Sequence, residues 1–288
     1  MLHPFRSAAL SLISLPLFTI IVFGLAPLAV VVTWSFWTWD ASTYWIKPDF
    51  SFAGYVAIFD AGRWTVILST LAKAMGAALL CLLIAYPSAY AVHFLAGRRL
   101  AIILLALMTI PFFTSYLIRS FSWRLVLGRT GVVNTGLQEL GLTTAPIDWL
   151  LFSNFAVLIG LVASYLPFAT FPLLLSMRRL DTTVLAAARD LGAGFWKTLT
   201  TIMIPLTMPG IFAGFLFVFV MVAGSSTEVQ MLGGAGATII SVMINDVMRV
   251  ANFPLAFAIS TVVLAVIFAL VLIGNRLFGL ASLFEDRT

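Results

Sequence analysis

Few side chains in this sequence could do chemistry, and their spacing argues against most enzymatic classes. The three lysines, Lys47, Lys73 and Lys197, never follow a glycine, so no Gly-x4-Gly-Lys-Ser/Thr loop is present to hold nucleotide phosphates. The two histidines, His3 and His93, are far apart and suggest no metal-ligand cluster. An intramembrane Ser–His dyad would need both groups at one membrane depth, and the sequence offers no such pair. We therefore expect neither ATP hydrolysis nor metal binding nor other catalysis by this chain.

The side chains that could bind a solute are acidic and aromatic. Glu228 and Asp246 lie near the ends of apolar stretches, where a carboxylate attracts cations strongly in a low dielectric. The rings of Trp123, Tyr165 and Phe168 could make cation–π contacts. Each carboxylate also has an ordinary interpretation as a solvated loop group, and each ring as a core or lipid-facing group. The sequence leaves both interpretations open.

The most distinctive polar segment is residues 178–205, a charged and glycine-punctuated stretch in a very apolar chain. Asp181 is placed to cap a helix over Thr182–Leu191. Gly192 and Gly194 are placed to end this helix in a left-handed conformation. Such a segment gains nothing in lipid, so it is expected either to lie on the membrane surface or to contact a cytoplasmic partner.

The first helix of this segment offers small and polar side chains side by side. The small residues Ala186, Ala187 and Ala188 permit close approach to another surface. The charged pair beside them, Arg189 and Asp190, supplies polar contacts. A second helix, Phe195–Met203, is predicted to follow at an angle. Pro205 and Pro209 then restrict how the chain enters the next apolar stretch.

The elements that must position these groups are membrane helices. The chain has 288 residues, of which 62% are hydrophobic and 9% are charged, with a mean hydropathy of +1.10. A soluble domain of this size could not cover itself with so few charges. Six apolar intervals are long enough to cross a hydrocarbon core of about 30 Å. The predicted spans are approximately 10–34, 74–96, 100–118, 150–177, 204–226 and 252–275.

The expected fold is therefore an all-α, polytopic membrane protein made of one domain, 1–288. The first interval is too long for a signal peptide and is interpreted as an uncleaved span. Residues 63–73 are expected to lie along the outer interface, and 127–142 to form a turn followed by a short amphipathic helix. The arginine pairs 98–99 and 178–179 favour the cytoplasmic side, which puts both termini in the cytoplasm. The net charge of +5 then reports topology and gives no reason to expect nucleic-acid binding.

The stretch AAARDLGAGFWKTLTTIMIPL resembles the cytoplasmic signature of the permease subunits of ABC importers. That signature is Glu-Ala-Ala, three residues, Gly, and about nine residues to an Ile-x-Leu-Pro-like end. The matching positions are Ala187, Ala188, Gly192, Ile202 and Pro205. Ala186 stands where the family usually has Glu, and Ile204 stands for Leu. Segments 118–134, 155–181, 231–244 and 252–260 also look like the polyamine branch of these permeases.

The resemblance implies partners and a site. Two ABC ATPase subunits would bind from inside and use ATP and Mg²⁺, while this chain binds no cofactor or metal itself. A second permease subunit, in the polyamine branch a sister chain, would complete the pathway in the bilayer of a bacterial inner membrane. A periplasmic or extracellular substrate-binding protein would deliver the solute. The coupling residues would be Ala186, Ala187, Ala188, Arg189, Asp190, Gly192 and Pro205.

The function implied is ATP-driven import of a small solute, with putrescine or spermidine as the expected cargo. An importer for another organic solute, such as an opine-like compound, is the alternative. A secondary carrier is a further alternative, but such carriers tend to have ionisable groups near the middle of their spans, and these spans have none. A carrier would also give no reason for the signature loop.

Overall fold

The computed structural model describes residues 16–234 and 237–278. Helices dominate, with one short pair of strands. The elements are η1 (Ile21–Leu25), α2 (Ala26–Trp34), β1 (Thr38–Asp40), β2 (Trp45–Lys47), α3 (Ala53–Val56), α4 (Arg63–Tyr90), η2 (Ala91–Leu95), α5 (Arg98–Thr109), η3 (Ile110–Phe113), α6 (Tyr116–Leu127), α7 (Val132–Glu139), η4 (Asp148–Leu150), α8 (Asn154–Met177), α9 (Thr182–Asp190), α10 (Phe195–Thr198), η5 (Leu199–Met203), α11 (Ile204–Gly224), α12 (Thr227–Leu232), α13 (Ile240–Arg249) and α14 (Phe253–Phe278).

Five helical stretches within the described residues are long and apolar enough to cross a membrane. They are Pro16–Trp34, Arg63–Leu95, Asn154–Met177, Phe195–Gly224 and Phe253–Phe278. The predicted all-helical membrane protein is thus confirmed, with five candidate spans where six were predicted. The start of the first predicted span, the charged tail after Phe278 and both termini lie outside the described residues.

The third predicted span, 100–118, is not one continuous helix. Helix α5 ends at Thr109, and at about 1.5 Å per residue its 12 residues cover only about 18 Å. A 3-10 turn, Ile110–Phe113, follows, and α6 begins at Tyr116. The physical reason is Pro111, which has no backbone N–H to continue the α-helical hydrogen bonds.

Two further boundaries differ from the sequence-based expectation. Residues 63–73 belong to α4, so the second span begins at Arg63 and not near residue 74. The expected separate helix Phe195–Met203 is instead continuous with the fifth predicted span. A π-helical turn, η5, joins the two, and the N–H of Ile204 bonds to the carbonyl of Leu199 five residues back. The wider turn lets the chain pass Pro205 without breaking, because Pro205 then occupies the first turn of α11.

The described chain divides into two compact units, and each is considered by itself. The first contains the chain up to Trp64 together with Met243–Val266. It includes the antiparallel pair β1–β2, in which Thr38 lies opposite Lys47. Lys47 Nζ lies 2.8 Å from Asp40 Oδ2, and this hydrogen bond holds the pKa of Asp40 well below its usual range.

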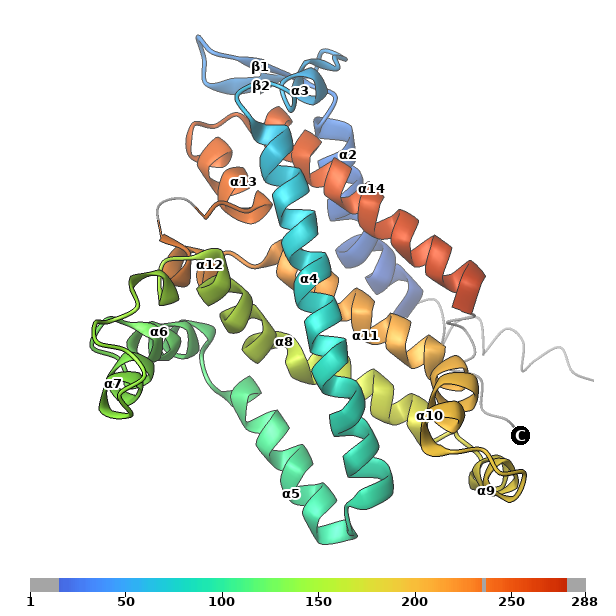
Figure 1. Cartoon of the computed structure of the whole chain (residues 1–288). Helices are drawn as coiled ribbons and strands as arrows, with labels where there is room; N and C mark the ends of the chain where they lie inside the picture. Colours follow the sequence, from blue (N-terminus) through green and yellow to red (C-terminus); the bar gives the residue numbers. More distant parts are fainter. Residues whose placement is uncertain (1–15, 235–236, 279–288) are drawn as a thin grey trace, which may run out of the picture. The chain divides into compact units, whose positions relative to one another are not determined.

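The second unit contains Thr65–Val242 and the chain from Ile267, and it is built around the packing of α8 on α11 (Figure 1). Gly210 and Gly214 let the two helices approach closely, because a Cβ at Gly210 would collide with Ser176, and a Cβ at Gly214 would meet the backbone of Ala169. Small residues on one face of α4 complete the core, namely Ala74, Ala77, Ala78, Cys81, Ala85 and Ala89.

Candidate functional site

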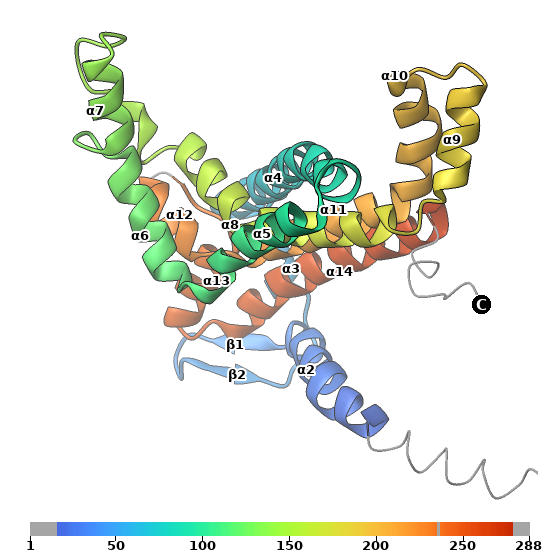
Figure 2. The same cartoon turned by 90° about the horizontal axis from the view of Figure 1, so that it is seen from below.

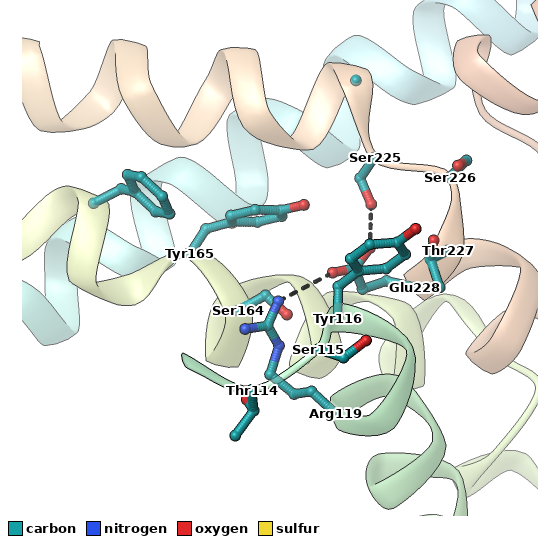
Figure 3. A pocket seen from close by; sticks show the side chains of 12 residues that line it. Thr114, Ser115, Tyr116, Arg119, Ser164, Tyr165, Ser225, Ser226, Thr227 and Glu228 are labelled. Carbon is teal, nitrogen blue, oxygen red and sulfur yellow. Dashed lines mark hydrogen bonds and ion pairs between the residues drawn. The ribbon is translucent and has the colours of Figure 1, made fainter. Parts of the chain in front are cut away.

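A cavity of about 450 Å³ lies within the second unit, where three parts of the chain meet (Figure 3). The start of α6, the middle of α8 and the turn between α11 and α12 form its walls. The lining residues are Thr114, Ser115, Tyr116, Arg119, Ser164, Tyr165, Phe168, Gly224, Ser225, Ser226, Thr227 and Glu228. The break after α5 supplies Thr114 and Ser115. Irregular backbone at membrane depth is tolerated where it lines a cavity of this kind.

Glu228 carries the only carboxylate of this lining, and it is almost completely buried, at 2% exposed. Ser225 Oγ donates a hydrogen bond of 2.5 Å to Glu228 Oε2. Arg119 Nη2 lies 3.8 Å from the other oxygen, Oε1, which accepts no hydrogen bond from the described residues. The carboxylate is therefore anchored by a hydroxyl on one side and faces a positive charge, without a direct hydrogen bond, on the other.

The charge of Arg119 compensates that of Glu228 within the cavity. At this separation two unit charges attract by about 4 kcal/mol for an effective dielectric constant near 20. Burial of both groups opposes this gain, because an ion taken out of water loses hydration worth several kcal/mol. Both side chains line the cavity, but Arg119 keeps 18% of its side-chain surface exposed, whereas Glu228 keeps only 3%.

Local sequence explains how Glu228 reaches this position. Helix α11 ends at Gly224, and Ser225 is extended, with ψ 135°. The Ser241 hydroxyl donates to the Ser225 carbonyl at 2.5 Å, which fixes the turn. Helix α12 begins at Thr227, so Glu228 lies in its first turn, where the free N–H groups favour a negative side chain.

Only some of the residues predicted to bind the solute line this cavity. Tyr165 and Phe168 line the cavity with Glu228, with their ring centroids 6.2 Å apart, and Figure 3 shows the Tyr165 ring beside Ser164. Trp123 is half-buried and packs against the hydrophobic core instead. Asp246 lies on α13 with 62% of its side chain exposed, and Arg249 on the same helix is 3.8 Å away.

Sequence reasoning missed Arg119, Tyr116 and Ser225 as members of the site. One signal was available: Arg119 and Glu228 each interrupt the chain at the end of an apolar stretch, and opposite charges in so apolar a sequence often pair. Nothing in the sequence indicated that these two are the pair.

The second candidate region is the loop around α9, which has most of the predicted local structure. Asp181 caps the helix, since its carboxylate accepts the N–H of Thr183 at 2.8 Å, and this bond lowers the pKa of Asp181. Gly192 has φ +79°, the left-handed conformation that was expected. Gly194, expected to share this role, has an ordinary φ of −68° and begins α10.

The loop presents a mixed face to its surroundings. Ala188 and Leu185 are buried toward the rest of the unit, whereas Ala186 and Ala187 are exposed. The three alanines are therefore not equivalent, because only two of them are free for contact with another surface. Arg189, Asp190 and Pro205 are exposed as well, and Leu191 at the tip is 88% exposed. Figure 2 shows α9 alongside α10, forming a helical hairpin.

One continuous helical stretch connects this loop to the cavity. Phe195–Gly224 begins directly after the loop and ends at a residue that lines the cavity. Helix α8 provides a second connection, since Tyr165 lies about 18 Å along the helix from its end at Met177. The loop and the cavity are thus connected by the same pair of packed helices, α8 and α11.

Comparison with known proteins identifies the class of this membrane protein. The family described as "Binding-protein-dependent transport system inner membrane component" matches residues 81–287, and the chain belongs to it. It is the permease of a binding-protein-dependent ABC importer, a multi-pass protein of the inner membrane. Permeases of this family bind no cofactor themselves, and they work in a complex with a substrate-binding protein and with an ATPase that is a separate subunit.

Particular relatives narrow this class. The chain is 34% identical to the spermidine/putrescine transport system permease protein PotB of Haemophilus influenzae, covering 90% of this chain and 91% of that one. It is 35% identical to PotB of Escherichia coli K12, with 88% and 91% covered. A solved structure of a bacterial alginate ABC transporter, in complex with an alginate pentasaccharide-bound periplasmic protein, has the same fold, with a TM-score of 0.74, 18% identity and 94% of each chain covered.

Proposed function

We propose that this permease imports polyamines of the putrescine and spermidine type. The proposal is supported by its similarity to spermidine/putrescine permeases over about nine-tenths of the chain. The observation that carries it in the structure is the buried carboxylate of Glu228 in the wall of a 450 Å³ cavity. A primary ammonium group is a compact cation with three donors, and a carboxylate in a low dielectric attracts it strongly.

The aromatic rings of the cavity would assist such a cargo. Tyr165, Phe168 and Tyr116 line the same cavity as the acidic group. Ring faces attract cations within about 6 Å of the centroid, and their edges pack on the methylene segments of a polyamine. A diamine needs this combination of a charged end site and an apolar path.

The loop around α9 is proposed to be the coupling element. Two ATPase subunits would bind the assembly from the cytoplasm and hold α9 through Ala186, Ala187, Arg189 and Asp190. Closure of the ATPases would move α9, and the stretch Phe195–Gly224 would carry this motion to the cavity as a rigid lever. Ala188 would position the helix from its buried side, while Gly192 and Pro205 would set the angles of the lever.

Ala186 is the weak point of this coupling proposal, because the family signature has Glu there. The exposed Asp190 lies one turn further along α9 and offers a carboxylate on the neighbouring part of the surface. We propose that Asp190 makes the polar contact that the missing Glu would have made. The shape of the helix does not depend on residue 186.

The remaining topology is proposed as follows. Helix α5, the break at Ile110–Ser115 and α6 together form a sixth, discontinuous crossing, and both compact units belong to one membrane domain, 1–288. Both termini lie in the cytoplasm, and the segments around 35–62, 127–149 and 224–249 face the binding protein. A sister permease occupies the second position of the pathway.

A second candidate cargo follows from Arg119. An opine-like solute carries carboxylates as well as an amine, and the guanidinium of Arg119 lies in the same cavity as Glu228. Such a solute would satisfy both charges at once. The two candidates differ in whether an anionic group on the cargo helps or hinders binding.

Uptake by the complete complex in proteoliposomes tests these assignments. Labelled putrescine or spermidine is supplied on the side of the binding protein, and ATP on the side of the ATPase subunits. Octopine and a neutral sugar serve as competitors. We expect ATP-dependent uptake of a labelled polyamine. The other polyamine should inhibit this uptake by competition, and the sugar should not. Competition by octopine alone would favour the second candidate. Failure of both polyamines to be transported or to compete would overturn the polyamine assignment.

A further inference from the structure

We propose that Arg119 is a built-in substitute for the cargo cation, which holds Glu228 in the empty cavity and is displaced by the arriving ammonium group. This inference rests on the proposed polyamine function and assigns a specificity role to a residue outside the predicted site. It concerns how the cavity stays closed to other cations when no polyamine is present.

The geometry of the pair carries the proposal. Glu228 Oε2 accepts the Ser225 hydroxyl, whereas Oε1 accepts no hydrogen bond from the described residues. Arg119 Nη2 stands 3.8 Å from this oxygen, which is close enough for charge compensation and beyond the length of a hydrogen bond. The acceptor is thus balanced electrostatically, while its capacity to accept a direct hydrogen bond is unused.

An incoming ammonium group would use that unused acceptor once Arg119 moves aside. It can donate directly to Oε1, which a guanidinium held at 3.8 Å does not do, and charge-assisted hydrogen bonds are about twice as strong as neutral ones. Arg119 lines the cavity and keeps 18% of its side-chain surface exposed, so the exchange would take place at the cavity wall. The exchange keeps one positive charge beside the buried carboxylate before and after cargo arrives.

The origin of the two groups supports an exchange over a fixed structural pair. Arg119 is on α6, and Glu228 follows α11, the helix that begins at the α9 loop. A movement of α11 would therefore change the distance between the two charges. The attraction between Arg119 and Glu228 would weaken when a shift of that helix separates them, and a cargo cation could then replace Arg119 most easily.

Without Arg119 the carboxylate should accept any small cation. A concentration series of methylammonium, added during labelled spermidine uptake at constant ionic strength, measures this with the complete complex. We expect wild-type uptake to resist methylammonium, whereas R119Q should be inhibited at a concentration at least about tenfold lower, equivalent to about 1.4 kcal/mol of lost discrimination. Gel filtration of the purified complex checks that R119Q assembles.

A double variant supplies a readout that a purely structural role would not move. In E228Q the guanidinium of Arg119 is left without its carboxylate partner and repels the cargo, so uptake should fall. Adding R119Q to E228Q removes this repulsion, and uptake should rise at least about threefold above that of E228Q alone. The comparison also covers the case in which R119Q does not assemble, because the double variant carries no uncompensated charge.

Each result has a definite meaning. If R119Q resists methylammonium as well as the wild type does, the role of Arg119 is overturned. The same holds if the double variant takes up no more spermidine than E228Q. Neither result would contradict polyamine import. Loss of octopine competition in R119Q without any gain in methylammonium sensitivity would also overturn it and assign Arg119 to a cargo carboxylate. No polyamine uptake by the wild-type complex would overturn the proposed function and this inference together.

Discussion

The cavity at Glu228 and the loop at α9 both concentrate polar groups in a very apolar protein, but they do so in opposite ways. In the cavity a charged pair is buried, and its members come from segments more than 100 residues apart in the sequence. In the loop the charged groups are exposed, and they come from one run of ten residues. The first arrangement depends on tertiary packing, and the second is local.

This difference separates what the two regions can do. A buried carboxylate acts through strong, short-range electrostatics on whatever enters its cavity, because little water screens it. An exposed helix with small side chains can bind a partner through shape complementarity, because salt screens the charges on its surface. This difference is the basis of our proposal that the cavity recognises the solute and the loop couples to the ATPase; the stretch Phe195–Gly224 joins the two regions.

Replacing Glu228 by Gln should be the most damaging change to transport. A hydrogen bond to a charged group contributes about 1.5–3 kcal/mol, so uptake at low polyamine concentration should fall about 10- to 100-fold. The measurement is labelled spermidine uptake by the reconstituted complex. Asp246→Asn is the matched control, since Asp246 is exposed on α13 and its pair with Arg249 is a surface pair. Equal losses in both variants would contradict the assignment of the cavity.

Replacing Gly192 by Leu should uncouple the loop. At φ +79° a side chain is strained by about 1–2 kcal/mol, and the end of α9 would be displaced. We expect at least about a tenfold loss of uptake and weaker binding of the ATPase in a pull-down. The reason is that the backbone strain adds to the loss of the contact between the loop and the ATPase. Gly194→Leu adds the same bulk two residues away at an ordinary φ of −68° and should keep more than half of the activity. Unchanged binding and uptake in Gly192→Leu would rule out the docking role.

A Leu at Gly214 should weaken the packing that connects the two regions. Its Cβ would meet the backbone of Ala169 on α8, and overpacking of this kind costs about 1–3 kcal/mol. Thermal unfolding of the detergent-solubilised protein measures the loss. Gly76→Leu is the control, because no atom lies within 4 Å of the Cβ position there. If both variants unfold at the same temperature as the wild type, α8 and α11 do not depend on this close contact.

Asp181→Ala should have a small effect confined to the loop. Loss of an N-cap weakens the first turn of α9 and should reduce uptake about two- to fivefold, with Asp181→Asn, which can still cap, close to wild type. The folded-state pKa of Asp181 is lowered, so the cap contributes fully above the ordinary aspartate pKa of about 4 and is lost only as pH falls through the lower folded value. Uptake measured between pH 6 and 8 should therefore show no change from this group, and a loss of the cap in that range would contradict the assignment.

Local patterns predicted the local features well. The Asp181 cap, the left-handed Gly192 and the short helix Val132–Glu139 all depend on residues within a few positions of one another. The five confirmed helical stretches follow from length and hydropathy alone. The third span failed because a proline break counts for little in a hydropathy average, although it ends an α-helix. The helix end expected at Met203 is absent because a π-helical turn accommodates Pro205 in one continuous helical stretch.

The cavity could be predicted only in part. Glu228, Tyr165 and Phe168 were found because their chemical types suit a cation, but the same reasoning selected Trp123 and Asp246, which lie elsewhere. Residue type does not reveal which groups share a cavity. That depends on how α6, α8 and α11 cross, and the close approach at Gly210 and Gly214 helps to set the crossing of α8 and α11.

The sequence by itself determined the class of this protein, because apolar length, charge distribution and the loop signature are properties of contiguous residues. It also determined that the loop at α9 is a capped helix followed by a glycine turn. Only the tertiary structure decided that Arg119 stands opposite Glu228, and that the helix leaving the loop ends at Gly224 in the wall of the same cavity. The physical reason is that an ion pair requires a few ångströms of separation in space, which helix packing sets and sequence distance does not.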